Sequence, residues 1–220
     1  MDVKKLIEEF KKMDTCCISD AADRLGIPCG LYGIKPVVKG TSFCGQAFTV
    51  HYVPCGTVKG TVGDFLDDVK PGEVVVIDNA GRDYCTVWGD LMSISSSVRG
   101  IAGTVIDGVC RDIPTIYRLQ YPIFTKGTYM VTGKDRVQVD SVNVPVAVSD
   151  VQIKPGDILR GDDTGVVAIP LERAEEVLAT ASMIAEKEAA IEVAVSQGKS
   201  LKEARAAAGY HKLQTHVEEK

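Results

Sequence analysis

The spacing of hydrophobic residues at the start of the chain predicts two helices. Within residues 3–13, apolar side chains recur along one helical face, at Val3, Leu6, Ile7 and Phe10. A second helix is expected to end at Leu25, before Gly26, with Ser19 or Asp20 as its N-cap. Residues 1–26 are therefore interpreted as an N-terminal helical part.

The middle of the chain has the pattern of strands, and its C-terminal part returns to a helical period. Short apolar runs between turn residues predict strands at residues 42–50, 73–78, 101–107, 123–125, 136–139, 146–148, 157–160 and 166–169. Within the C-terminal part, residues 171–208, a long helix is predicted from about 171 to 197 and a shorter one around 201–208; residues 210–220 are expected to form a tail. Because no Pro- or Ser-rich linker divides the chain, we expect one α/β domain over residues 1–220.

Residues 73–120 predict a parallel strand–helix–strand unit. The run at 73–78 is continuously apolar, which is typical of a strand covered on both faces. Gly89 and Asp90 open a helix-sized segment that Gly100 closes, and after the next strand Asp112 precedes a second helix start. In such a unit the carboxyl ends of the strands and the amino ends of the following helices share one edge of the sheet. We therefore expect Asp90 and Asp112 to lie close together there.

Composition narrows the classes of partner. Apolar residues make up 45% of the chain and charged residues 25%, and the net charge is −5 without a cluster of Lys and Arg, so we expect no nucleic-acid partner. The uncharged stretches are too short for a membrane-spanning helix, so no membrane partner is expected. The seven cysteines show no C-x-x-C spacing and no signal peptide is recognised, which predicts reduced thiols and a cytoplasmic location.

The predicted edge collects groups that bind an anion and a cation. The N–H groups at two helix amino ends attract anions, and the Arg111 guanidinium can hold a carboxylate through two parallel hydrogen bonds. Asp112 offers the hard oxygen ligands that Mg²⁺ or Mn²⁺ prefers. Together these groups predict a site for a small 2-oxo acid. The same residues leave a structural alternative open, in which Asp90 and Asp112 only cap helices and Arg111 pairs with Asp107 or Asp112.

Other polar or aromatic residues give weaker indications of a functional role. His51 lies in a predicted strand, where packing is the expected role, and the spacing of His211 and His216 in the tail indicates no metal site. Asp162 and Asp163 are interpreted as part of a hairpin turn, with a role at a neighbouring subunit's site left open. Trp88 is expected either to anchor the loop before Gly89 or to line the pocket.

The spacing around these residues resembles that of a known family. Asp90, twenty residues, then Arg111 and Asp112 is similar to the shared motif of the regulator of ribonuclease activity A and the class II 4-hydroxy-4-methyl-2-oxoglutarate / 4-carboxy-4-hydroxy-2-oxoadipate aldolases. The resemblance extends to residues 18–26, 45–50 and 161–170, and so covers most of residues 14–180 in order.

The resemblance implies a fold, a site and an activity. The implied fold is an α/β/β/α sandwich with a long C-terminal helix, assembled as homotrimers that sometimes pair into homohexamers. Mg²⁺ or Mn²⁺ would lie on Asp112, and the substrate would contact Arg111 and a loop formed by Gly89, Asp90, Leu91 and Met92. The implied reaction is retro-aldol cleavage of a 4-hydroxy-2-oxo acid, or decarboxylation of oxaloacetate, in which pyruvate is released through an enolate stabilised by the metal.

In this interpretation Arg111 and Asp90 are the catalytic residues. Arg111 and the cation stabilise the negative charge on the enolate oxygen, while Asp90 orients the water that moves protons. The chain departs from the family at Thr115, where many of the aldolases have a carboxylate, and this argues against aldol cleavage more than against decarboxylation. One alternative is a non-catalytic regulator that binds ribonuclease E or a helicase. Another is a methyltransferase, which the absence of a glycine-rich loop after the first apolar strand disfavours.

Overall fold

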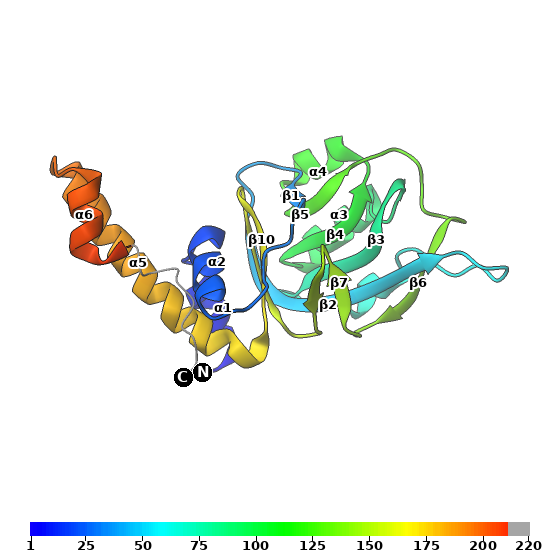
Figure 1. Cartoon of the computed structure of the whole chain (residues 1–220). Coiled ribbons are helices and arrows are strands. Elements are labelled where there is room, and N and C mark those ends of the chain that lie inside the picture. Colours follow the sequence, from blue (N-terminus) through cyan, green and yellow to red (C-terminus); the bar gives the residue numbers. More distant parts are fainter. Residues whose placement is uncertain (211–220) are drawn as a thin grey trace.

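The computed structural model describes residues 1–210 and has helices on both sides of its β-sheets (Figure 1). The helices are α1 (Val3–Phe10), α2 (Thr15–Arg24), α3 (Asp90–Arg99), α4 (Ile113–Leu119), α5 (Ala174–Ser196) and α6 (Leu201–Ala208), with 3₁₀ turns η1 (Asp64–Asp68) and η2 (Leu171–Arg173). The strands are β1 (Lys35–Pro36), β2 (Phe43–Pro54), β3 (Val74–Thr86), β4 (Gly103–Cys110), β5 (Ile123–Thr128), β6 (Val137–Val142), β7 (Val146–Val148), β8 (Val151–Ile153), β9 (Ile158–Asp162) and β10 (Gly165–Ile169).

The strands form one mixed sheet and a separate hairpin. The eight-stranded sheet has the order β1-β5-β4-β3-β2-β9-β10, with β6 also paired to β2, and β7 pairs only with β8. Strands β2, β3, β4 and β5 are parallel to their neighbours in that series, and the remaining pairs are antiparallel. The long strand β2 pairs with β9 near its start and with β3 and β6 further along, and it therefore passes from one β layer to the other.

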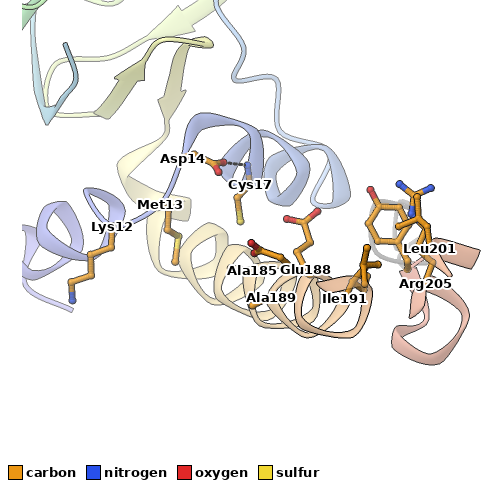
Figure 2. A pocket seen from close by; sticks show the side chains of 13 residues that line it. Lys12, Met13, Asp14, Cys17, Ala185, Glu188, Ala189, Ile191, Leu201 and Arg205 are labelled. Atoms are coloured by element: carbon orange, nitrogen blue, oxygen red, sulfur yellow. Dashed lines mark hydrogen bonds between the residues drawn. The ribbon is translucent and has the colours of Figure 1, made fainter. Parts of the chain in front are cut away.

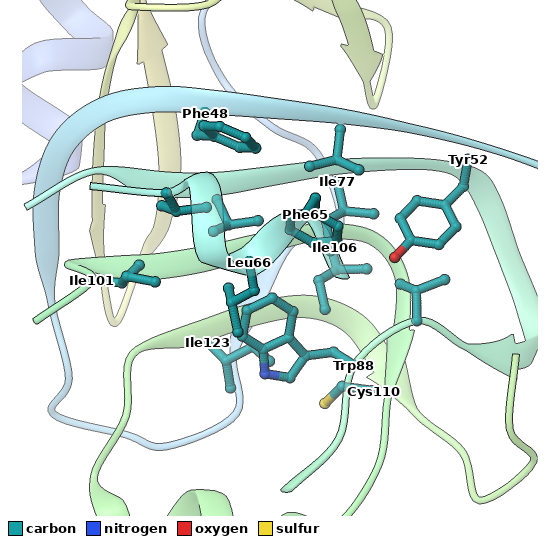
Figure 3. Packing of buried hydrophobic residues seen from close by; sticks show 14 of the residues in the cluster. Phe48, Tyr52, Phe65, Leu66, Ile77, Trp88, Ile101, Ile106, Cys110 and Ile123 are labelled. Atoms are coloured by element: carbon teal, nitrogen blue, oxygen red, sulfur yellow. The ribbon is translucent and has the colours of Figure 1, made fainter. Parts of the chain in front are cut away.

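Three hydrophobic clusters separate four layers. The first lies between α3, α4 and the parallel strands and includes Ile116. Trp88, Ile101, Ile106 and Ile123 of this cluster are labelled in Figure 3. The second lies between the two β layers and includes Val76, Val105, Phe124, Ile153 and Leu159. The third lies between β9, β10 and the terminal helices and includes Phe10, Ile18, Ile158, Val177 and Ile184. This arrangement confirms the expected α/β/β/α sandwich. Strands β3 and β4 are covered on both faces, as the continuous apolar run at residues 73–78 predicted for β3.

The second helix begins earlier than the sequence indicated. Its N-cap is Asp14, whose Oδ1 accepts a hydrogen bond from the Cys17 amide at 2.7 Å. The prediction of Ser19 or Asp20 as N-cap was wrong, because both residues lie inside α2. The predicted stop is confirmed: Gly26 has a φ of 68°, the left-handed conformation that favours glycine after a helix.

Strand β3 also departs from the prediction. A loop was expected after residue 78, but the strand continues to Thr86 through register shifts against β4, one between Asp78 and Arg82 and one between Arg82 and Thr86. Ala80 and Gly81, with φ values of 50° and 67°, produce the first irregularity. Strands β1 and β8 were missed because two or three residues show no periodicity.

The C-terminal helices agree with the prediction apart from their first turn. Helices α5 and α6 occupy the predicted positions, but Leu171–Arg173 is a 3₁₀ turn. The tail beyond residue 210, with His211 and His216, lies outside the described residues. Among the helices of residues 1–210, none combines the length and apolarity needed to cross a membrane.

Candidate active site at the edge of the parallel sheet

The structure brings Asp90, Arg111 and Asp112 together where β3 and β4 lead into α3 and α4. The amide of Asp90, the first residue of α3, donates to Asp112 Oδ2 at 3.1 Å. Asp112 stands directly before α4, so this bond joins the amino ends of the two helices. The predicted juxtaposition is therefore confirmed.

The Asp112 carboxylate makes contacts within the protein and also remains partly exposed to solvent. Its Oδ2 also lies 3.3 Å from Arg111 Nε, and the two side chains are 36% and 39% exposed. Asp112 occupies the N-cap position of α4, but its side chain caps α3 instead, through the Asp90 amide. Asp107, the other partner considered for Arg111, instead forms an ion pair with Lys126 Nζ at 2.5 Å. The exposed remainder of the Arg111–Asp112 pair is what a ligand would use.

Gly89 permits the close approach of these groups. A Cβ atom at this position would lie 2.6 Å from Asp112 Oδ2 and 3.3 Å from Arg111 Nε. Gly89 is also the N-cap of α3 and supplies no side-chain cap, while the Leu91 amide bonds to Asp90 Oδ1 at 2.8 Å. The first turn of α3 therefore attracts carboxylates of the protein itself, as expected for a helix amino end.

Trp88 anchors the segment that carries Gly89. The indole is 2% exposed, its Nε1 donates to Ser93 Oγ at 2.9 Å, and its ring stacks on Tyr121 at 6.3 Å between centroids. Its carbonyl oxygen accepts from the Arg111 amide at 3.0 Å. Because Trp88 also contributes to the wall of the neighbouring cleft, both expectations for this residue are confirmed.

A cleft of about 440 Å³ lies beside these groups. Gly89, Asp90, Leu91, Met92 and Arg111 line it, as the predicted substrate loop requires. The Asp112 carboxylate sits at its margin, against Gly89, and is not among the lining residues. The cleft is also lined by residues that the sequence did not indicate, namely 60–64, Thr132 and Lys134. No motif signals them, because they reach the cleft from separate segments.

The wall formed by residues 60–64 is held by β2 and β6. The Tyr52 hydroxyl donates to the Val62 carbonyl oxygen, and burial raises the pKa of Tyr52, which keeps it a donor. Gln138 Oε1 accepts from the Gly60 amide at 3.0 Å, and Gly63 packs against Met92. This part of the cleft lining is therefore tethered to β2 and β6.

The donor set suits a divalent cation that keeps water and substrate as ligands. Within residues 1–210 no three His, Cys, Asp or Glu side chains lie close enough to form a protein-only metal site. Mg²⁺, however, usually binds through one or two carboxylates together with waters and substrate oxygens. The Asp112 carboxylate, about one-third exposed next to a cleft, fits that pattern and does not fit a structural metal site.

The remaining candidates lie elsewhere or have structural partners. His51 Nδ1 lies 3.2 Å from Asp78 Oδ2 in the neighbouring strand. Asp162 accepts from the Thr15 amide and hydroxyl, both at 2.8 Å, and Asp163 accepts from the Gly40 amide at 2.7 Å, at the predicted β9–β10 turn. Burial raises the pKa of the Cys110 thiol, which precedes Arg111, to about 12, so this thiol is not a nucleophile at neutral pH.

Comparison with known proteins establishes the class to which this fold and site belong. The RraA-like family, described as Aldolase/RraA, matches residues 15–168, and the chain belongs to this family. Protein DlpA of Legionella pneumophila is 38% identical over 91% of this chain, which spans 33% of DlpA, about a third of its length. A protein of Halalkalibacterium halodurans with the proposed name 4-hydroxy-4-methyl-2-oxoglutarate aldolase is 35% identical over 86% of this chain and 88% of its own length.

Solved structures agree with this assignment. A crystal structure of a protein from Pseudomonas syringae pv. tomato is similar with a TM-score of 0.85 and 41% identity, over 92% of this chain and 97% of that one. Streptomyces coelicolor RraAS2, described as an unusual member of the RNase ES inhibitor RraA protein family, has a TM-score of 0.79 and 26% identity, over 89% of this chain and 96% of that one. The family thus holds proteins named for aldolase activity and proteins named for ribonuclease inhibition.

Proposed function

We propose that this protein is a divalent-metal-dependent lyase that acts on a small 2-oxo acid and releases pyruvate, by retro-aldol cleavage of a 4-hydroxy-2-oxo acid, by decarboxylation of oxaloacetate, or by both. The observation that carries the proposal is the pair formed by Arg111 and Asp112, one-third exposed at a helix amino end beside a cleft. A guanidinium, helix N–H groups and a hard carboxylate are the groups that a 2-oxo acid and its cation need.

In this proposal, each residue of the site binds a different group of the substrate or its cation. Arg111 is placed to bind the carboxylate and keto group, since its guanidinium is engaged only at Nε by Asp112 among the contacts of residues 1–210. Met92, the third residue of α3, presents an amide without a side-chain cap to the same anion. Asp112 would hold Mg²⁺ or Mn²⁺, which when bound supplies Lewis-acid stabilisation of the charge on the keto oxygen.

Two further groups extend the site. Lys134 also lines the cleft and takes part in no ion pair within residues 1–210, so its ammonium is available for a second carboxylate such as that of oxaloacetate. Asp90 uses Oδ1 to accept the Leu91 amide, which fixes its carboxylate and leaves the other oxygen for a water or a substrate hydroxyl. From that position Asp90 can accept and return a proton during bond cleavage.

The direct test measures pyruvate release from a panel of 2-oxo acids. We expect turnover of oxaloacetate or a 4-hydroxy-2-oxo acid with Mg²⁺ or Mn²⁺, and loss of that turnover with a chelator. Arg111→Lys keeps the charge but not the two-pronged geometry, so we expect a drop in kcat/KM of about 100-fold or more. Arg118→Lys, an exposed change in α4 outside the cleft, is the matched control and should behave like the unmodified protein. Full activity of Arg111→Lys, or activity that a chelator leaves intact, would refute the proposal.

A second function has some support. The likeness to RraAS2, and Thr115 at the position where many of the aldolases have a carboxylate, favour a regulator that binds a ribonuclease without turnover. A pull-down with ribonuclease E distinguishes the two. Binding of the nuclease together with no pyruvate release from any 2-oxo acid would favour the regulator.

A further inference from the structure

Two hollows of residues 1–210, the cleft of the candidate active site and a groove at the C-terminal helices, differ in how their charged groups are engaged. The groove, of about 540 Å³, lies between residues 12–17 and helices α5 and α6 (Figure 2). Asp14 caps α2 there, and Lys12 forms an ion pair with Glu9. Arg205 lies over the ring of Tyr210, 4.6 Å from its centroid. These charges of the groove have partners within the protein, whereas the cleft contains charged groups that the described residues leave unpaired.

Asp64 is an unpaired carboxylate of the cleft. It is the first residue of the 3₁₀ turn η1, it is exposed, and it lines the cleft. Throughout the described part of the chain, no hydrogen bond or ion pair engages its carboxylate. Asp67, in the same turn, pairs with Arg99 at 3.2 Å and does not line the cleft. Asp64 is therefore the carboxylate of this turn that a ligand in the cleft can contact.

Contacts of the two preceding residues fix the place of Asp64. The Tyr52 hydroxyl donates to the carbonyl oxygen of Val62. Burial, and then the nearby charge of Asp64, raise the pKa of Tyr52, so this hydroxyl stays protonated and keeps its hydrogen bond. Gly63 lies against Met92, since a Cβ atom added to this glycine would be 3.2 Å from Met92 Sδ. Because Met92 is the third residue of α3, Asp64 follows directly on the contact with the helix amino end.

The proposed function leaves part of the cleft for the portion of the substrate that is cleaved off. Arg111, the amino end of α3 and a cation on Asp112 would hold the carboxylate and keto group of the pyruvate unit. The cleft of about 440 Å³ falls within the range of roughly 300–1,000 Å³ that is typical of small-molecule sites, so it has room beyond this unit. Apart from Arg111 and Asp90, the charged residues that line it are Asp64 and Lys134.

Resting on the proposed lyase function, we propose that Asp64 determines specificity by favouring substrates with a hydroxyl group on C4 over oxaloacetate. A carboxylate accepts a strong hydrogen bond from a hydroxyl group and repels another carboxylate. In a 4-hydroxy-2-oxo acid C4 carries the hydroxyl group, whereas in oxaloacetate C4 is itself the carboxylate carbon. The Lys134 ammonium has the opposite preference, so the two residues together set the balance between aldol cleavage and decarboxylation. Asp64 forms no covalent bond in this role, and proton transfer stays with Asp90.

The test compares two substrates with Mg²⁺ present: 4-hydroxy-2-oxopentanoate, which yields pyruvate and acetaldehyde, and oxaloacetate, which yields pyruvate and carbon dioxide. Asp64→Leu removes both the acceptor and the charge. We expect kcat/KM for the hydroxy acid to fall by about 10-fold or more. We expect KM for oxaloacetate to fall by about 2-fold, because the repulsion is removed. Asp64→Asn keeps an acceptor oxygen without the charge, so KM for oxaloacetate should fall equally, while kcat/KM for the hydroxy acid should fall by only about 3-fold.

Asp68, an exposed residue at the end of the same turn, provides the matched controls because it does not line the cleft. Asp68→Leu and Asp68→Asn should leave the kinetics with both substrates unchanged, and circular dichroism verifies the fold of every variant. Equal effects of Asp64→Leu on both substrates, unchanged kinetics, or pyruvate release from oxaloacetate alone would overturn the role of Asp64 and leave the lyase function standing. No pyruvate release by the unmodified protein from any 2-oxo acid would overturn the lyase function and the role of Asp64 together.

Discussion

Asp107 and Asp112 are five residues apart in the sequence, but their carboxylates differ in burial and in partners. Asp107 lies within β4, its side chain is 9% exposed, and Lys126 from β5 neutralises it. Asp112 follows the same strand, where the chain turns into α4, and its side chain is 36% exposed. The first carboxylate forms an ion pair with a cation of the protein. The second contacts Arg111 and a helix amide and stays partly exposed, which is why we propose it as the ligand of an external cation.

The strongest test of this comparison exchanges each carboxylate for the isosteric amide. Asp112→Asn still accepts the Asp90 amide but binds a divalent cation poorly, so we expect pyruvate release to fall by about 100-fold or more with little change in stability. Asp107→Asn leaves Lys126 near a buried neutral group, and we expect a loss of about 2–4 kcal/mol in the free energy of unfolding. Kinetic assays and urea unfolding of both variants measure the two effects.

Each variant serves as the control for the other. Well below its unfolding midpoint, Asp107→Asn should retain pyruvate release, because Asp107 does not line the cleft. If Asp112→Asn lost as much stability as Asp107→Asn, or if Asp107→Asn alone lost activity, the division between a structural and a ligand-binding carboxylate would be wrong.

The sequence predicted the part of this site that depends on local order along the chain. Parallel topology and helix spacing were enough to place Asp90 beside Asp112, since both follow from a strand–helix–strand unit. The pairing choice of Arg111 remained open, because it depends on Lys126, which reaches Asp107 from another strand. The wall with Lys134 was missed for the same reason: tertiary contacts assemble it, and no periodic pattern marks it.

N-cap preferences of single residues do not predict where α2 begins. Ser19, Asp20 and Asp14 are all good N-cap residues, and only the packing of Cys17, Ile18 and Ala21 on α5 selects Asp14. In β3, two register shifts extend the strand past its apolar run, and the pattern of residues 79–86 resembles a loop because that strand is irregular. Tertiary contacts decided both cases.

Alanine substitutions at the two glycines that flank α3 test the same site with a smaller expected effect on activity. A Cβ at Gly89 would contact Asp112 Oδ2 and Arg111 Nε, both at the ends of movable side chains. We therefore expect Gly89→Ala to lower kcat/KM by about 10-fold or more while stability changes by less than about 1 kcal/mol. Substrate kinetics and thermal unfolding measure this directly.

Gly100, at the other end of the same helix, provides the matched control. Its φ of 72° is the left-handed conformation that disfavours alanine, and the nearest atom to a new Cβ is Pro71 Cβ at 3.9 Å. Gly100→Ala should cost about 1 kcal/mol of stability and leave kinetics unchanged. Equal kinetic effects of the two substitutions would show that Gly89 acts through the helix as a whole and not through the Arg111–Asp112 pair.

The smallest effect is expected at Asp162, a carboxylate that accepts hydrogen bonds from Thr15 and Thr164. Burial alone would raise the pKa of Asp162, but the Thr15 amide and hydroxyl and the Thr164 amide outweigh it and lower the pKa below its usual 3.8. A lowered pKa in the folded state gives stability that is present above pH 4 and is lost as the pH falls toward the folded-state pKa.

Asp162→Asn should therefore cost about 1 kcal/mol at pH 7, and the difference from the unmodified protein should shrink below pH 4. Urea unfolding at several pH values measures this, and a difference that stays constant down to pH 3 would mean that the charge of Asp162 contributes nothing to the attachment of α2 to the β9–β10 hairpin.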